Sequence, residues 1–183
     1  TMELGSNSPL IVMSDADLEK VAAATVAGGF ANAGQVCIST QRVFAERSVY
    51  ADFLDALVAP TEAFSMGNPL DEGVRMGPMI RESDANRVGE WIAEAVSGGA
   101  RIMAGGDHEG TLHSPTVVAD VKPDMRVSRE ELFGPAVAVS AFTDINDAIA
   151  MANDSRFGLS AGIFTQNLDW AMRFAREVQS GSL

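Results

Sequence analysis

The stretch Val137-Ala138-Val139-Ser140-Ala141-Phe142 is almost continuously apolar, which is typical of a strand buried on both faces of a parallel sheet. The residues after it repeat apolar side chains at helical spacing, namely Ile145, Ala148, Ile149 and Ala152. A further strand is expected at residues 159–165 and a further helix at residues 168–178. This alternation predicts βαβ units, in which helices cover a mainly parallel sheet.

The same alternation extends toward the N-terminus. Strands are expected at residues 42–45, 101–104 and 115–118, and loops at residues 67–78 and 105–114. Helices are expected from about residue 15 into the thirties, after Ser48, and from Ser83 to the Gly98-Gly99 pair. Ser14 is expected to cap the first of these helices, and Pro60 to break or kink the second. The predicted fold class is α/β, a mainly parallel sheet flanked by helices on both faces and truncated at both ends.

Composition excludes several classes of protein. The chain has 183 residues, the size of one domain, and its 46% apolar and 21% charged residues are typical of a globular core rather than a disordered chain. Its 13 basic against 25 acidic residues give a net charge of −12, which disfavours nucleic acid and anionic membranes as partners. No membrane-length apolar run or signal pattern is present, so a cytoplasmic location is expected.

The single cysteine, Cys37, follows the Gly34-Gln35 pair at the expected end of a helix. One cysteine allows neither an internal disulfide nor a tetrathiolate metal site. Two interpretations stay open: a nucleophile presented at the end of an element, or a small buried apolar residue. His108 and His113 match no standard metal-ligand spacing and are interpreted as solvated loop residues, so no metal is expected. A cysteine hydrolase pairing one of them with Cys37 is an alternative.

Two acidic residues stand out by their neighbours. Glu3 lies between Met2 and Leu4, and burial there would raise the pKa of its carboxyl toward that of a general base; otherwise it is a frayed terminal residue. Ser128 and Glu131 have the spacing of a helix capping box, so the residues alone favour a structural role for Glu131 over ligand binding. No Gly-x-Gly-x-x-Gly motif is present, and nothing in the motifs alone indicates dinucleotide binding.

Three segments, taken in order, resemble the catalytic domain of the aldehyde dehydrogenase superfamily. Residues 2–9, Met-Glu-Leu-Gly-Ser-Asn-Ser-Pro, resemble the family's Glu-Leu-Gly-Gly-Lys-Ser-Pro segment. Residues 34–37, Gly-Gln-Val-Cys, resemble its Gly-Gln-x-Cys nucleophile segment, and residues 130–135, Glu-Glu-Leu-Phe-Gly-Pro, resemble its Glu-Glu-x-Phe-Gly-Pro segment. The resemblance covers essentially the whole chain, with Ser6 and Asn7 in place of the family's Gly and Lys.

The resemblance implies oxidation of a small aldehyde to a carboxylic acid with NAD or NADP. Cys37 would add to the aldehyde as a thiolate, and the thiohemiacetal would pass hydride to the cofactor and leave a thioester. Glu3 would then activate the water that hydrolyses the thioester. The cofactor-binding residues that the resemblance implies are Glu131, Phe133, Leu4 and Gly5.

The resemblance also implies what surrounds this chain. Residues 1–183 are expected to be a single nucleophile-bearing catalytic domain, without the family's nucleotide-binding domain and C-terminal oligomerisation segment. The chain alone is therefore expected to bind NAD poorly and to have little activity, and the full-length protein to form a homo-oligomer. Two alternatives remain: a CoA-acylating aldehyde dehydrogenase, in which CoA resolves the thioester, and a non-catalytic structural domain with a buried cysteine.

Overall fold

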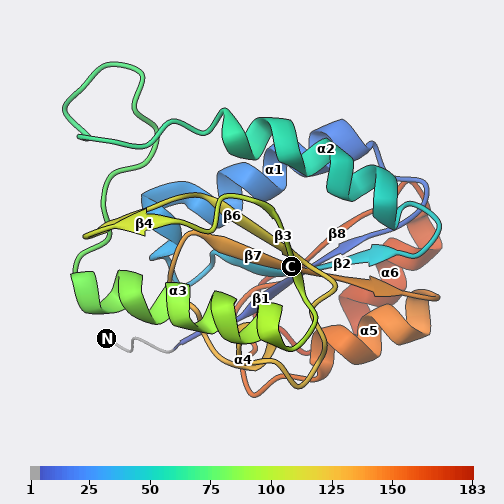
Figure 1. Ribbon diagram of the computed structural model, residues 1–183. Coiled ribbons are helices and arrows are strands. Elements are labelled where there is room, and N and C mark those ends of the chain that lie inside the picture. The colour runs from blue at the N-terminus through green and yellow to red at the C-terminus, as the bar shows by residue number, and fades with distance from the viewer. Residues whose placement is uncertain (1–4) are drawn as a thin grey trace.

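The computed structural model describes residues 5–183 and is built around one six-stranded sheet (Figure 1). The strand order is β3-β6-β7-β2-β1-β8, and β3 alone runs antiparallel to its neighbour. The strands are β1 (Ser8–Val12), β2 (Thr40–Glu46), β3 (Arg101–Ala104), β6 (Thr116–Ala119), β7 (Ala136–Phe142) and β8 (Gly162–Phe164). The predicted α/β class with a mainly parallel sheet is confirmed.

Helices cover both faces of the sheet, as predicted. They are α1 (Leu18–Phe30), α2 (Tyr50–Glu62), α3 (Glu82–Ser97), α4 (Arg126–Arg129), α5 (Ile145–Asn153) and α6 (Leu168–Glu177). Helices α1 and α2 lie on one face and α3 to α6 on the other (Figure 1). Adjacent residues of strand β2 pack on opposite faces of the sheet. Val43 packs in the core that includes α1 and α2, whereas Phe44 packs with α5 and α6. None of the helices within residues 5–183 combines the length and the apolar character needed to cross a bilayer.

Two helix boundaries differ from the prediction. Asp17, not Ser14, caps α1, because its carboxylate accepts a hydrogen bond from the Lys20 amide at 3.2 Å. Pro60 lies inside α2, which continues to Glu62. Proline removes one amide donor, and so close to the end of the helix this loss affects only the last turn.

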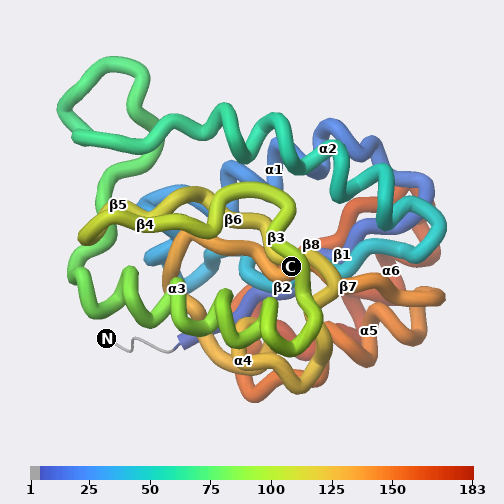
Figure 2. The backbone as a smooth tube through the Cα atoms, viewed as in Figure 1, coloured from blue at the N-terminus to red at the C-terminus, as the bar shows by residue number. Residues whose placement is uncertain are grey.

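The loop predicted at residues 105–114 contains a short antiparallel hairpin, β4 (His108–Glu109) and β5 (Leu112–His113). Figure 2 shows this hairpin beside α3, and the predicted loop at residues 67–78 extending away from the body of the fold. Strands of two residues are too short to give an alternating pattern, so the sequence could not reveal them. The imidazoles of His108 and His113 stack with centroids 5.4 Å apart.

His113 of this hairpin is buried, so its interpretation as a solvated loop residue was wrong. Its burial predicts a loss of stability in acid. Burial lowers the pKa of His113, which is 1% exposed, below its ordinary value of 6.5. The unfolded chain therefore binds more protons than the native chain below pH 6.5, so the free energy of unfolding falls as the pH drops through that value. In denaturant titrations at pH 7.5 and 5.5, His113→Phe should make this difference smaller, because phenylalanine has no group that binds a proton. His108→Gln, which removes the exposed imidazole, is the control and should retain most of the difference in unfolding free energy between the two pH values. An unchanged pH dependence in His113→Phe would show that His113 is not the source of the acid sensitivity.

Candidate active site

Three chain segments meet at one edge of the sheet, just before strands β1, β2 and β7. These strands are parallel neighbours in the order β7-β2-β1, so the segments that lead into them emerge side by side. Together they line an open hollow of about 520 Å³. The residues that line it are Gly5, Asn32, Gln35, Val36, Cys37, Glu131 and Phe133.

The hollow brings together Cys37, Gly5, Glu131 and Phe133, which are distant in the sequence and were predicted as site residues. Glu3 and Leu4, the other predicted site residues, lie outside the described residues. Asn32, Gln35 and Val36 also line the hollow, and the sequence motifs did not mark them as site residues in their own right.

Cys37 lies in an exposed turn between α1 and β2. The turn is closed by a hydrogen bond of 2.9 Å from the Ser39 amide to the Val36 carbonyl, and Cys37 is partly exposed. The interpretation of Cys37 as a small buried apolar residue therefore does not match its position. His113 is buried and bonds the Ser114 carbonyl, and no histidine lines the hollow within residues 5–183. The cysteine hydrolase alternative thus lacks an imidazole beside the thiol.

The chain reaches this turn through an unusual backbone conformation. Asn32, Ala33 and Gly34 have φ angles of 51°, 54° and 67°, so the left-handed region is occupied by consecutive residues. At Gly34 a Cβ atom would lie 2.0 Å from the carbonyl oxygen of Gly134, which is too close for any side chain. Gly34 is therefore required both by its backbone conformation and by the close approach of the segment before β7.

The Gln35 side chain forms hydrogen bonds that hold the turn of Cys37 in place. Its Oε1 accepts a hydrogen bond from the Ile80 amide at 3.0 Å, and its Nε2 donates to the Asn32 carbonyl at 3.1 Å. Gln35 is buried, so both bonds are shielded from competition with water. The side chain thus ties the turn that carries Cys37 to the chain that leads into α3.

Glu131 does not form the capping box that its spacing predicted. Helix α4 ends at Arg129, so Ser128 lies in the last turn of a helix and cannot cap its start. Instead, Glu131 Oε1 accepts a hydrogen bond from the Ser6 amide at 2.8 Å. A Cβ atom on Gly5 would lie 2.7 Å from Glu131 Oε2, so the backbone at Gly5 packs directly against the carboxylate. The carboxylate therefore joins the segments before β1 and β7.

The hollow thus offers a thiol, a carboxylate and an aromatic ring. No group of three or more metal-ligating side chains occurs among residues 5–183. Comparison with protein families gives a match to the aldehyde dehydrogenase family model over residues 1–183. The chain belongs to this family. The resemblance inferred from the three motifs is confirmed.

Individual aldehyde dehydrogenases are similar along the whole chain. A 3-sulfolactaldehyde dehydrogenase of Priestia aryabhattai is 48% identical over 183 residues, which are the full chain and 38% of that protein. The crystal structure of lactaldehyde dehydrogenase from Escherichia coli matches 98% of this chain and 39% of its own with a TM-score of 0.94 and 40% identity. Betaine aldehyde dehydrogenase from Staphylococcus aureus, solved in complex with NAD⁺, matches 98% of this chain and 37% of its own with a TM-score of 0.93 and 34% identity. The chain thus spans less than two fifths of the length of these relatives.

Strand β2 of this aldehyde dehydrogenase chain carries two further side chains that hold the site together. Gln41 Oε1 accepts a hydrogen bond from the Leu132 amide at 2.9 Å and so fixes the residue between Glu131 and Phe133. Arg42 bonds the Asn7 carbonyl at 3.0 Å. Sequence motifs did not single out either residue, because a polar side chain within a strand gives no local sign of which segment it will meet.

Proposed function

We propose that residues 1–183 form the cysteine-bearing catalytic domain of a longer enzyme that oxidises an aldehyde to a carboxylic acid with NAD or NADP. The observation that carries this proposal is the hollow itself, in which a partly exposed thiol at Cys37 shares one cavity with Glu131 and Phe133. The dehydrogenase names of the relatives, and the NAD⁺ complex of the Staphylococcus aureus relative, support the reaction class and the cofactor.

The described residues fit the nicotinamide end of such a cofactor. Glu131 uses Oε1 for the Ser6 amide, and its Oε2 is available to accept from sugar hydroxyls. Phe133 lines the hollow with an aromatic side chain, and the backbone of Gly5 lies beside the Glu131 carboxylate. When bound, the nicotinamide dinucleotide supplies the hydride acceptor. We assign these three residues to cofactor binding, together with Leu4 through its backbone.

Cys37 carries the substrate through the reaction. Its thiolate sulfur forms a bond to the aldehyde carbon, and the carbonyl oxygen becomes an oxyanion that the Cys37 backbone N–H stabilises. Loss of hydride from this carbon, to the acceptor that a bound cofactor would supply, would leave a thioester on Cys37. Water adds to the thioester while Glu3 takes its proton, the carbon–sulfur bond breaks, and the carboxylic acid leaves with the thiolate restored.

Glu3→Gln in the full-length enzyme should separate the two halves of this reaction. The amide cannot take a proton from water, so hydrolysis of the thioester should slow by about 10²- to 10⁴-fold while hydride transfer continues. Stopped-flow absorbance should then show a burst of reduced cofactor of about one equivalent per active site, followed by a slow steady state. Glu19→Gln, an exposed acid on α1, is the control and should behave as the wild type. Absence of a burst would exclude Glu3 as the base of hydrolysis.

The reaction itself is tested with the full-length enzyme and a panel of aldehydes drawn from its relatives: lactaldehyde, 3-sulfolactaldehyde and betaine aldehyde. Reduction of NAD or NADP with release of free acid in the absence of CoA is the expected result. Turnover that requires CoA would assign the chain to acylating enzymes. No turnover with any aldehyde, combined with a Cys37 that does not react with iodoacetamide at neutral pH, would identify a structural domain instead.

A further inference from the structure

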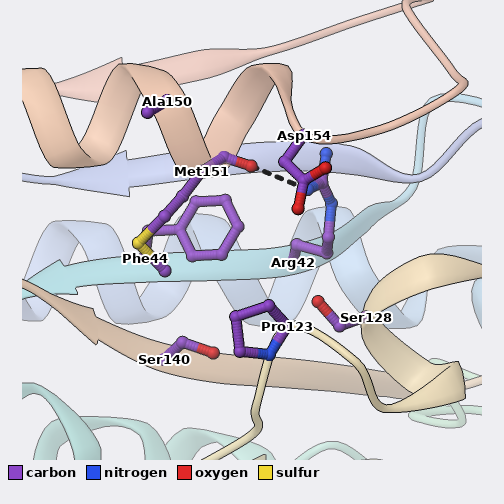
Figure 3. Close-up of a pocket in the computed structure, with 8 residues that line it drawn as sticks. All are labelled: Arg42, Phe44, Pro123, Ser128, Ser140, Ala150, Met151 and Asp154. Carbon is purple, nitrogen blue, oxygen red and sulfur yellow. Dashed lines mark hydrogen bonds between the residues drawn. The ribbon is translucent and has the colours of Figure 1, made fainter.

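Arg42 is a buried charged residue that does not line the hollow of Cys37. It is 2% exposed, and from β2 its side chain crosses to the C-terminal end of α5 (Figure 3). There Nη1 donates to the Met151 carbonyl and Nη2 to the Ala152 carbonyl, each at 3.1 Å. These last-turn carbonyls have no amide partner within the helix, so the guanidinium caps the helix. Burial lowers the pKa of Arg42 to about 10, which still leaves it charged at neutral pH.

The third donor of the guanidinium, Nε, points toward the edge of the sheet at which the hollow lies. Arg42 Nε donates to the Asn7 carbonyl at 3.0 Å. At this point the register between β1 and β2 shifts, between Ser8 and Pro9, and a proline has no amide to contribute to the ladder. The arginine side chain thus supplies a donor where the regular pairing of the two strands is interrupted.

Asn7 is held from a second side by α4. Its Nδ2 donates to the Ser128 carbonyl at 2.8 Å, and the residue is fully buried. The next residue toward the N-terminus, Ser6, donates its amide to Glu131, which follows α4. Arg42 therefore joins α5 to Asn7 by hydrogen bonds, and the peptide chain joins Asn7 to Ser6, which is hydrogen-bonded to Glu131 in the hollow.

We infer that Arg42, acting through Asn7, is a positioning residue for residues 5–8, which follow Glu3 in the sequence and lead into β1, and that it sets the rate of thioester hydrolysis without touching substrate. This inference rests on the proposed function. Arg42 does not line the hollow of Cys37. It lines a separate cavity of about 220 Å³ with Phe44, Ser140 and Asp154 (Figure 3). Cys37 is fixed by different contacts, those of Gln35 and Gly34, so loss of the Arg42 bond should leave the thiol in place.

Arg42→Lys in the full-length enzyme isolates this role. Lysine keeps the charge and can still donate to a carbonyl of α5, but it has no Nε donor partway along its side chain for Asn7. At saturating cofactor, we expect a normal burst of reduced cofactor and a steady-state rate lowered by about 10- to 100-fold. The rate at which iodoacetamide alkylates Cys37 should be unchanged.

Ile149→Val is the matched control, because it loosens a buried contact of the same helix without a bond to Asn7. A purely structural role for Arg42 would lower burst and steady state together, in both variants and in proportion to the loss of folded protein, and that result would overturn the inference.

If the wild type itself shows no turnover, the proposed function fails and positioning is measured by hydrogen exchange. Amides of residues 5–8 should then exchange faster in Arg42→Lys than in Ile149→Val; equal rates would also overturn the inference.

Discussion

Cys37→Ala is expected to abolish aldehyde oxidation by the full-length enzyme, lowering kcat by about 10⁴-fold or more. Every covalent step of the proposed reaction uses the sulfur of Cys37, and no second cysteine exists in residues 1–183 to replace it. Neither the burst of reduced cofactor nor the steady state should be observed. Hydrolysis of an ester substrate by the same thiol should disappear with it.

The fold should tolerate this substitution, because Cys37 is a partly exposed residue in a turn. The free energy of unfolding should change by less than about 0.5 kcal/mol, and binding of cofactor, followed by quenching of protein fluorescence, should persist. Cys37→Ser is a second variant that keeps the size of the side chain but replaces the thiol by a hydroxyl that does not ionise at neutral pH. Activity above about 1% of wild type in Cys37→Ala would rule out the proposed nucleophile.

Gly34→Ala is expected to have the largest effect on the folded structure. A methyl group there would lie 2.0 Å from the Gly134 carbonyl oxygen, a backbone atom that cannot move without shifting the start of β7. The added cost of the left-handed backbone at φ 67° applies as well. Together we expect a loss of about 4 kcal/mol in the free energy of unfolding, read from denaturant titration.

Gly110→Ala separates these two costs. Gly110 has a similar φ of 56°, but a Cβ atom there would meet nothing within 4 Å. Its substitution should therefore cost only the backbone penalty of about 1 kcal/mol. Equal losses in the two variants would show that the contact with Gly134 does not constrain the cysteine turn. In any Gly34→Ala protein that folds, alkylation of Cys37 by iodoacetamide should change in rate, because the turn that presents the thiol has moved.

The chain also shows why one structural prediction about the site was wrong. Ser128 and Glu131 have the spacing of a capping box, and that spacing is the same whether Ser128 begins a helix or lies near its end. In the fold Ser128 lies in the last turn of α4, which releases the Glu131 carboxylate to accept from Ser6. Local spacing describes which pairs can interact in one element, whereas here the partner is 125 residues away.

Local sequence was sufficient for the fold class. The continuous apolar run of β7 and the helical spacing after it required a buried parallel strand with a helical cover, because burial of apolar surface dominates the free energy of folding. The short segments around Gly5, Cys37, Glu131 and Phe133 were likewise recognisable as motifs. Strand β1, which contains Pro9, was not among the predicted strands, since proline weakens a strand pattern.

Only the tertiary structure decided that these motifs share one hollow. The order β7-β2-β1 places their preceding segments at the same edge of the sheet, and this order depends on backbone pairing between residues far apart in the chain. The hydrogen bonds of Arg42 to α5 and to Asn7 depend on the same strand pairing. Residue types and their spacing determine which elements form, because those interactions are local. Which elements become neighbours depends on long-range burial and hydrogen bonding, which no single segment contains.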